Sequence, residues 1–98
     1  MESNDTRNLT SADANTTVLV RGKSGIMTFY NVLKTSAHTV ALYDDNQTGT
    51  QVAANLICTI PASATVGTYR IQRALRKGLV AVVAASFAAD HLISHRAG

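Results

Sequence analysis

Short runs of apolar and β-branched residues, separated by turn-forming residues, make up the chain from residue 16 onward. Several runs alternate apolar and polar positions with the period of two that places successive side chains on opposite faces of a strand. Turn signals recur about every 8–12 residues, a spacing typical of an antiparallel sandwich or barrel. The pattern therefore predicts one all-β domain of about six to eight short strands, an antiparallel β-sandwich or jelly-roll-like barrel. The predicted strands cover residues 16–20, 26–33, 38–43, 51–60, 68–77, 79–83 and 90–96.

Glycine and proline indicate how some of these runs connect and end. The short link at residues 22–25 contains two glycines, and it predicts a hairpin that joins residues 16–20 to residues 26–33. Pro61 follows an apolar run and ends it, because proline has no backbone N–H to donate to a ladder.

Residues 68–77 fit either a strand or a helix. As a strand, the segment places its apolar residues on one face. As a helix, it places Arg70, Arg73 and Lys77 along one side. Gly78 interrupts a helix that would otherwise continue, and the 12 Thr and 9 Val of the chain favour strands, although its 15 Ala favour helix. An α+β domain with a helix within residues 69–89 is therefore the alternative to the all-β fold.

Residues 1–15 are polar, show no period and predict a flexible N-terminal arm ahead of a sandwich domain over residues 16–98. Leu9 is an isolated apolar residue in this segment, and it is predicted to anchor the arm in a groove of a neighbouring protein; the alternative is that an apolar residue occurs in a disordered tail by chance. Removal of residues 1–13 is then predicted to leave the domain folded. The acidic, polar start gives no sign of a signal peptide. The longest uncharged apolar stretch, residues 79–89, is far shorter than the roughly 20 residues of a membrane helix, so no membrane partner is expected.

The composition points to a surface that other proteins cover. Charged residues are 15% of the chain, against roughly 25% in an average domain. The net charge is +3, with a single Glu and three Lys, and Thr, Ser, Asn and Ala take the place of charged residues. Such a surface suits burial against neighbours, so a homo-oligomer or a bound subunit is predicted. Ile26, Val80 and Val82 are apolar residues that this interpretation leaves exposed.

Residues suited to catalysis or to cofactor binding are sparse. The chain has no glycine-rich phosphate loop, no nucleophile elbow and no paired carboxylates in distinct environments, so it is predicted not to be an enzyme and to need no cofactor or small-molecule substrate. His91 and His95 share one face of a strand or a helix and could share a metal ion. Apart from Asp90, which lies on the adjacent face, no third ligand accompanies them, so no metal site is predicted, and an exposed polar strand is the favoured interpretation. The single cysteine, Cys58, lies in an apolar run and is interpreted as a small buried hydrophobe.

One concentration of positive charge is a candidate binding surface. Together with Leu9, it makes up the predicted partner-binding residues, which are Arg70, Arg73, Arg76 and Lys77. Rim charges of this kind steer the approach of an acidic protein surface. Nucleic acid is disfavoured because its binding uses interleaved aromatic residues for stacking, and only Tyr69 is near. A solvated face without a partner is the alternative interpretation.

Three segments together resemble a known family. Residues 37–45 read AHTVALYDD, residues 76–83 read RKGLVAVV and residues 89–96 read ADHLISHR. Their order, within residues 16–96, resembles small virion proteins of tailed bacteriophages, which carry a V-x-L-Y-D strand, a [KR]-G-L-x-V-V strand and a closing strand that begins A-D and ends S-[YH]-R. An aromatic residue is commoner in that family at the position of His95. The resemblance implies a β-sandwich that decorates or cements a capsid or sits on the tail. It favours strands over residues 69–77 and 79–83, and it carries no functional residue over to this chain.

These observations lead to one functional expectation with two alternatives. The leading prediction is a capsid decoration or cement protein that binds the major capsid protein and copies of itself, and that lies on the surface of the phage particle after synthesis in the host cytoplasm. The first alternative is a tail, baseplate or fibre component of the virion. The second is a free binding module for carbohydrate or protein. The chain has only five aromatic residues in all and no Trp, which argues against a sugar-stacking platform.

Overall fold

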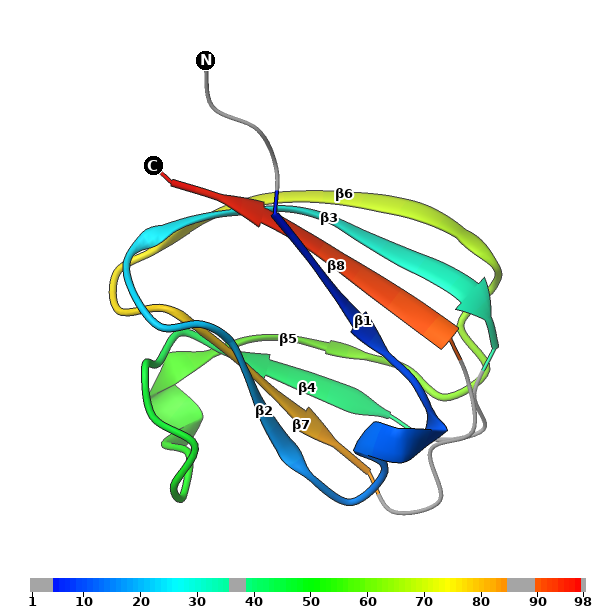
Figure 1. The fold of residues 1–98 in the computed structure, drawn as a ribbon, viewed down its shortest axis with the longest axis horizontal. Coiled ribbons are helices and arrows are strands. Elements are labelled where there is room, and N and C mark those ends of the chain that lie inside the picture. The colour runs from blue at the N-terminus through cyan, green and yellow to red at the C-terminus, as the bar shows by residue number, and fades with distance from the viewer. Residues whose placement is uncertain (1–4, 36–38, 85–89, 98) are drawn as a thin grey trace.

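Two antiparallel β-sheets packed face to face form the molecule (Figure 1). The computed structural model describes residues 5–35, 39–84 and 90–97. One sheet has the strand order β1-β8-β3-β6, and the other has the order β2-β7-β4-β5. The strands are β1 (Asp5–Leu9), β2 (Thr17–Arg21), β3 (Gly25–Lys34), β4 (Val40–Tyr43), β5 (Leu56–Ile60), β6 (Gly67–Leu75), β7 (Leu79–Val83) and β8 (Asp90–Arg96), with two short 3-10 segments, η1 (Ser11–Asp13) and η2 (Ala53–Asn55).

The predicted all-β fold is confirmed, and the segment that also fitted a helix is strand β6. Strands β7 and β8 begin and end at the predicted residues. Strand β5 is shorter than predicted, because residues 53–55 turn as η2 before the strand begins at Leu56. It ends at Ile60, directly before Pro61.

The core lies between the two sheets and follows the alternation of the sequence. In β8 the inward residues are His91, Ile93 and His95, while the residues between them lie on the outer face. The fully or almost fully buried apolar side chains that form one cluster are Leu9, Val18, Met27, Tyr30, Val32, Val40, Leu42, Ile60, Leu75, Leu79, Ala81, Val83 and Ile93.

The turn between β2 and β3 crosses from one sheet to the other, so the predicted hairpin is wrong. Strand β2 pairs with β7, and β3 pairs with β6 and β8. Arg21 ends β2 with its side chain buried, and its Nε donates a 2.9 Å hydrogen bond to the carbonyl of Ser24. A Cβ at Gly25 would lie 2.3 Å from the Nε of Arg21. Glycine therefore lets the guanidinium pass beneath the turn, and the link becomes an arch between sheets.

The described part of the predicted arm belongs to the sandwich. Residues 5–9 form β1, which pairs with β8 from Asp5–His95 to Leu9–His91. The side chain of Leu9 is 0% exposed and lies in the core of its own chain. The prediction that Leu9 anchors a free arm in a neighbour is therefore corrected, because the edge of β8 supplies the strand pairing and the core supplies the apolar contact. Residues 1–4 lie outside the described residues.

The first turn of the chain holds β1 in place. Thr10 and Asp13 form a capping box around η1, in which the backbone N–H of Thr10 donates to Oδ2 of Asp13 at 3.0 Å. The Nη2 of Arg7 in β1 lies 2.9 Å from Oδ1 of the same aspartate. These polar contacts explain how a polar segment without an apolar period still takes a fixed place.

One of the apolar residues expected on the surface is covered. Val80 is fully buried, whereas Ile26 and Val82 are half-buried. Strand β7 lies between β2 and β4, and Val80 pairs with Leu19 on one side and Tyr43 on the other. These two neighbours flank Val80 on the outer face of a central strand, which the sequence pattern alone does not reveal.

Candidate protein-interaction surface

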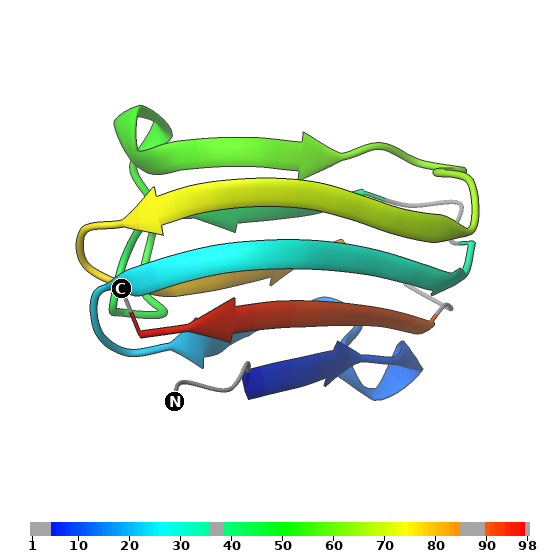
Figure 2. The same cartoon turned by 90° about the horizontal axis from the view of Figure 1, so that it is seen from above.

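The sandwich is open along one long side, where each of the two sheets ends in an edge strand. We call this side, formed by β5 and β6, the β5–β6 edge. Among the described residues, each of these strands pairs with a single neighbour, β4 for β5 and β3 for β6. Figure 2 shows β5 beyond the border of the upper sheet, with no strand of that sheet above it. The inner face of β5 is therefore incompletely covered.

The uncovered part of β5 is apolar. Cys58 pairs with Leu42, and Ile60 pairs with Val40, so both side chains point to the core side of the sheet. The pairing shifts register next to Ile57, which also packs against the core and is half-buried. We call Ile57, Cys58 and Ile60 the β5 shelf, in which Ile57 and Cys58 are half-buried and Ile60 is almost fully buried. Burial raises the pKa of the Cys58 thiol, and the charge of Arg73 opposes that shift, so the thiol is neutral at pH 7.

A hollow opens at one end of the β5 shelf. It has a volume of about 360 Å³ and is lined by residues 60–65 and Tyr69. The hydroxyl of Tyr69 donates a hydrogen bond to the carbonyl of Thr65, which holds the ring beside the loop. Tyr69 is 40% exposed, and nearby Val66 is 58% exposed. The hollow is therefore a place where an apolar side chain from outside can be buried.

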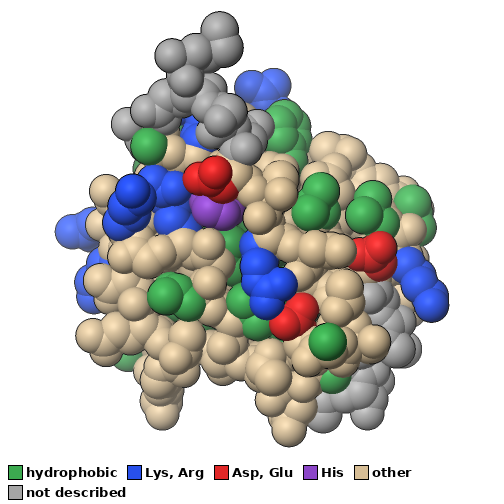
Figure 3. Space-filling model, in the orientation of Figure 1, with side chains coloured by type: hydrophobic (Ala, Val, Ile, Leu, Met, Phe, Trp, Pro, Cys, Tyr) green, Lys and Arg blue, Asp and Glu red, His purple; other side chains and the backbone are tan. Residues whose placement is uncertain are grey.

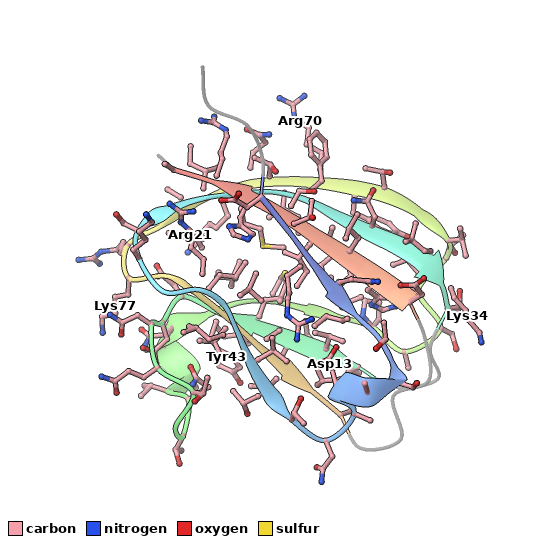
Figure 4. The ribbon with its side chains drawn as sticks, in the orientation of Figure 1. Asp13, Arg21, Lys34, Tyr43, Arg70 and Lys77 are labelled. Carbon is pink, nitrogen blue, oxygen red and sulfur yellow. The ribbon has the colours of Figure 1, made fainter. Side chains whose placement is uncertain are left out.

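Strand β6 presents different residues on its two faces. Arg70 pairs with Phe29 of β3, and its side chain extends away from the sandwich (Figure 4). Arg73 pairs with Met27, which is fully buried, so Arg73 lies on the inward side of the strand. Its charge acts on the Cys58 thiol and on the Asp44 carboxylate, which places it over the β5–β6 edge.

A carboxylate holds the turn that follows β6. Oδ2 of Asp44 accepts a 2.9 Å hydrogen bond from the backbone N–H of Arg76, and Oδ1 accepts from those of Lys77 at 2.9 Å and Gly78 at 3.3 Å. Burial alone would raise the pKa of Asp44, but these three N–H groups and the charge of Arg73 hold it below its usual value. A second hollow of about 380 Å³ lies here, lined by Asp44, Asn55, Arg76 and Lys77.

The basic side chains at this edge have no ionic partner among the residues that the structure describes. The ion pairs among the described residues are Arg7–Asp13 and Arg21–Asp5, and neither lies at this edge. Asp44 is the nearest carboxylate to the turn, and its oxygens already accept backbone hydrogen bonds. The β5–β6 edge thus combines apolar surface with positive charges that form no salt bridge among the described residues, although the Asp44 carboxylate partly offsets them.

The opposite side of the sandwich, over β1 and β2, has a different character. Figure 3 shows this side, where hydrophobic side chains are scattered and acidic side chains lie next to basic ones. Arg7 and Asp13 form an ion pair there, and Arg21 reaches between the sheets (Figure 4). Such a mixed surface has no single charge to attract a partner.

The two histidines of β8 are buried, so the interpretation of an exposed polar strand is wrong. β8 lies between β1 and β3 in its sheet, and its inward side chains are buried between the two sheets. Nδ1 of His91 lies 2.6 Å from the hydroxyl of Tyr30, and Nδ1 of His95 lies 3.5 Å from Nη1 of Arg21. Within the described ranges, no group of three or more His, Cys, Asp or Glu residues is arranged to hold a metal ion.

The predicted partner-binding residues therefore separate into three groups. Arg70 lies on the outer face of β6, and Arg73 lies on its inner side. Arg76 and Lys77 lie in the turn after β6, beside Asp44. Leu9 lies in the core, on a strand at the opposite border of the sheet.

Sequence reasoning missed the β5 shelf and the hollow beside Tyr69. The alternation of Leu56, Cys58 and Ile60 indicated a strand, but nothing in it shows that β5 ends a sheet. The exposed run after Pro61 was a further signal, because apolar Ala62, Ala64 and Val66 occur there in a loop.

Comparison of the chain with known proteins gives no match to a family model, a curated protein or a solved structure. Among the described residues, no helix is long and apolar enough to cross a membrane.

Proposed function

We propose that this protein is a non-enzymatic structural component of a phage particle, a capsid decoration or cement protein that binds the major capsid protein and stabilises the head. The observation that carries the proposal is the β5–β6 edge, where an incompletely covered apolar shelf lies beside basic side chains that form no salt bridge with any described residue. An acidic, partly apolar protein neighbour would stabilise such an edge, because it would cover the apolar surface and attract the basic side chains. The resemblance of three strand segments to small phage virion proteins agrees with this function.

The size and composition of the chain support the same role. The described residues span 33 × 30 × 21 Å, so one contact on the particle buries a modest area. Many copies on one particle stabilise it through the sum of such contacts, and copies that also contact one another add to that sum. A chain with only 15% charged residues limits the cost of desolvation on contact with neighbours.

The arrangement of the cations favours a protein neighbour over nucleic acid. Arg70 and Arg73 lie on opposite faces of β6, so the two arginines do not form one basic row. Tyr69 is the exposed aromatic residue beside them, whereas single-stranded nucleic acid uses several aromatic residues for stacking.

The direct test is to locate the protein in particles made from the genome that encodes it. Gradient-purified particles are analysed by mass spectrometry and by a density map of the whole particle. We expect the chain in many copies on the outer surface of the head. Absence from purified particles would overturn the proposal, and density confined to the tail would replace it with the tail or baseplate function.

The contribution of the basic residues is tested by adding purified protein to particles that lack it. We expect Arg70→Glu with Arg76→Glu to weaken attachment at least tenfold at low salt and to reduce its salt dependence. The matched control is Lys23→Glu with Lys34→Glu, which makes the same change in net charge at exposed positions outside β5 and β6. Equal attachment of both variants and the wild type would show that the basic residues do not face the particle.

A further inference from the structure

We infer that β6 accepts an extended, acidic segment of the partner protein as a fifth strand of its sheet. This inference deepens the proposed function, since it names the kind of contact that joins the protein to its neighbour. It rests on the unpaired border of β6, on the β5 shelf beneath that border and on the charges around it.

The geometry leaves a place for one more strand. The upper sheet ends at β6, while β5 of the lower sheet lies beyond it (Figure 2). A strand added next to β6 would therefore lie above β5 and cover the half-buried Ile57 and Cys58. Backbone groups on the outer border of β6 would pair with it, as in other cases of strand addition to a sheet edge.

The usable length of that border is set by an irregularity in β6. Gln72 has a φ of 54°, in the left-handed region, and the pairing of β6 with β3 shifts register at this point. Such irregularities interrupt pairing along an edge. The added segment would therefore pair along residues 67–71, the part of β6 that runs beside Tyr69 and the hollow of about 360 Å³.

The side chains around this border determine the chemistry of the added strand. Its inward residues would meet the β5 shelf and the hollow, so they would be apolar. Its outward residues would lie beside Arg70, so they would be acidic. Where the segment continues past residue 71, Arg73 favours a carboxylate on the inward side as well.

Charge also argues against a second copy of this chain as the occupant. Antiparallel pairing of two β6 strands along residues 67–71 places the Arg70 side chains of the two copies at diagonally neighbouring positions on the same face of the joined sheet. Like charges on neighbouring strands oppose pairing. Strand β6 itself carries no acidic residue, so self-pairing cannot neutralise these charges.

The experiment uses the full chain labelled with ¹⁵N and a seven-residue peptide that alternates aspartate and valine. We expect chemical-shift changes and slower hydrogen exchange at the backbone amides of residues 67–71 on titration with the peptide. A peptide that alternates lysine and valine should bind at least tenfold more weakly. A third peptide, with proline in place of the central valine and aspartate residues, should bind at least tenfold more weakly because it lacks N–H groups for the ladder.

Variants of the protein separate the charges from the fold. Arg70→Glu with Arg73→Glu should reduce affinity for the aspartate–valine peptide at least tenfold. Lys23→Glu with Lys34→Glu should keep the affinity for this peptide within twofold of the wild type. Circular dichroism of both variants tests whether they stay folded. Unchanged chemical shifts at residues 67–71 with millimolar aspartate–valine peptide would overturn the inference. Equal affinities for the proline peptide and the aspartate–valine peptide would overturn it as well.

Hydrogen exchange on particle-bound protein distinguishes this inference from the proposed function. Protection of residues 67–71 on the particle supports both. Attachment to the particle without that protection overturns the added strand and leaves the proposed function standing. Peptide binding by a chain that is absent from particles supports the added strand and overturns the proposed function. Dimers in sedimentation equilibrium that the Arg70→Glu, Arg73→Glu variant abolishes would assign the edge to a second copy, which also overturns the inference.

Discussion

The hydroxyl of Tyr30 in β3 lies 2.6 Å from Nδ1 of His91 in β8, and both side chains are enclosed between the sheets. The two rings meet edge to face, with centroids 5.3 Å apart and planes at 76°. Burial raises the pKa of the Tyr30 hydroxyl, and the Cys58 thiol on the facing sheet acts in the same direction. The pair is therefore a neutral polar contact in an otherwise apolar core.

Replacement of Tyr30 by phenylalanine tests what this contact contributes to stability. We expect Tyr30→Phe to lower the free energy of unfolding by about 1–3 kcal/mol, because the hydrogen bond between the Tyr30 hydroxyl and Nδ1 of buried His91 is lost. Urea unfolding measures the difference. The matched control is Tyr43→Phe, at a half-buried position on the outer face, which should change stability by less than about 0.5 kcal/mol. Equal stability of Tyr30→Phe and the wild type would contradict a stabilising bond.

The buried histidines predict a loss of stability in mild acid. Burial lowers the pKa of His91. The charge of nearby Asp90 and a backbone hydrogen bond with Lys34 act against this shift but only partly cancel it. Burial, and to a smaller extent the charge of Arg21, lower the pKa of His95. The charge of Asp5 partly cancels this shift. Below about pH 6.5 the unfolded chain therefore binds more protons than the folded one, and the free energy of unfolding falls as the pH falls.

Unfolding in urea at pH 7.5 and at pH 5.5 measures this effect. We expect the wild type to lose stability between these pH values and the His91→Gln, His95→Gln variant to lose less. Only the change with pH is compared, so a lower stability of the variant at both pH values does not affect the result. The same loss in both proteins would show that other groups cause the pH dependence.

The place of Leu9 in the core predicts that the N-terminal strand contributes to stability. We expect Leu9→Ala to lower the free energy of unfolding by about 2–5 kcal/mol, because it leaves a cavity between the sheets. Asn8→Ala, at the exposed neighbouring position, should stay within about 0.5 kcal/mol of the wild type. For the same reason, deletion of residues 1–13 should lower the melting temperature, contrary to the prediction from sequence. An unchanged melting temperature would show that β1 adds nothing to the isolated fold.

The bonds of Asp44 predict that this residue stabilises the turn between β6 and β7. Asp44→Asn removes the charge and replaces one acceptor oxygen by an amide, so at least one of the three backbone N–H groups loses its partner. We expect a loss of about 1–2 kcal/mol in the free energy of unfolding at pH 7.

Acid separates this effect from that of the histidines. The pKa of Asp44 is lowered in the folded state, so its contribution is present above about pH 4 and is lost as the pH falls below that value. Asp45→Asn is the matched control and should have little effect at pH 7. If both variants unfold at the same urea concentration, the turn does not depend on the Asp44 carboxylate.

Local pattern was sufficient to predict most strands but not their partners. The alternation in residues 90–96 and the Val-rich run at 79–83 gave β8 and β7 with their correct bounds. By contrast, a short link with two glycines fits both a hairpin and an arch between sheets. The buried side chain of Arg21, which packs against Gly25, accompanies the arch here.

The candidate site was predictable only in part, for the same reason. Arg70, Arg73, Arg76 and Lys77 stand out in the sequence as a concentration of charge. Their distribution over two faces of β6 and the following turn depends on the pairing with β3 and on the bonds to Asp44. The β5 shelf is apolar in sequence like any core strand, and it becomes a candidate surface because the upper sheet ends at β6.

The period of two and the breaks at glycine and Pro61 can be identified from the amino-acid sequence, and they predict an all-β chain with short strands. Those features act between residues close together in the chain, where backbone sterics and side-chain alternation are decided. Which strands end each sheet, the place of Leu9 in the core and the contact of Tyr30 with His91 become clear only from the folded molecule. These outcomes depend on long-range pairing, in which each strand takes the neighbour that best buries its apolar face, and a local pattern does not specify that neighbour.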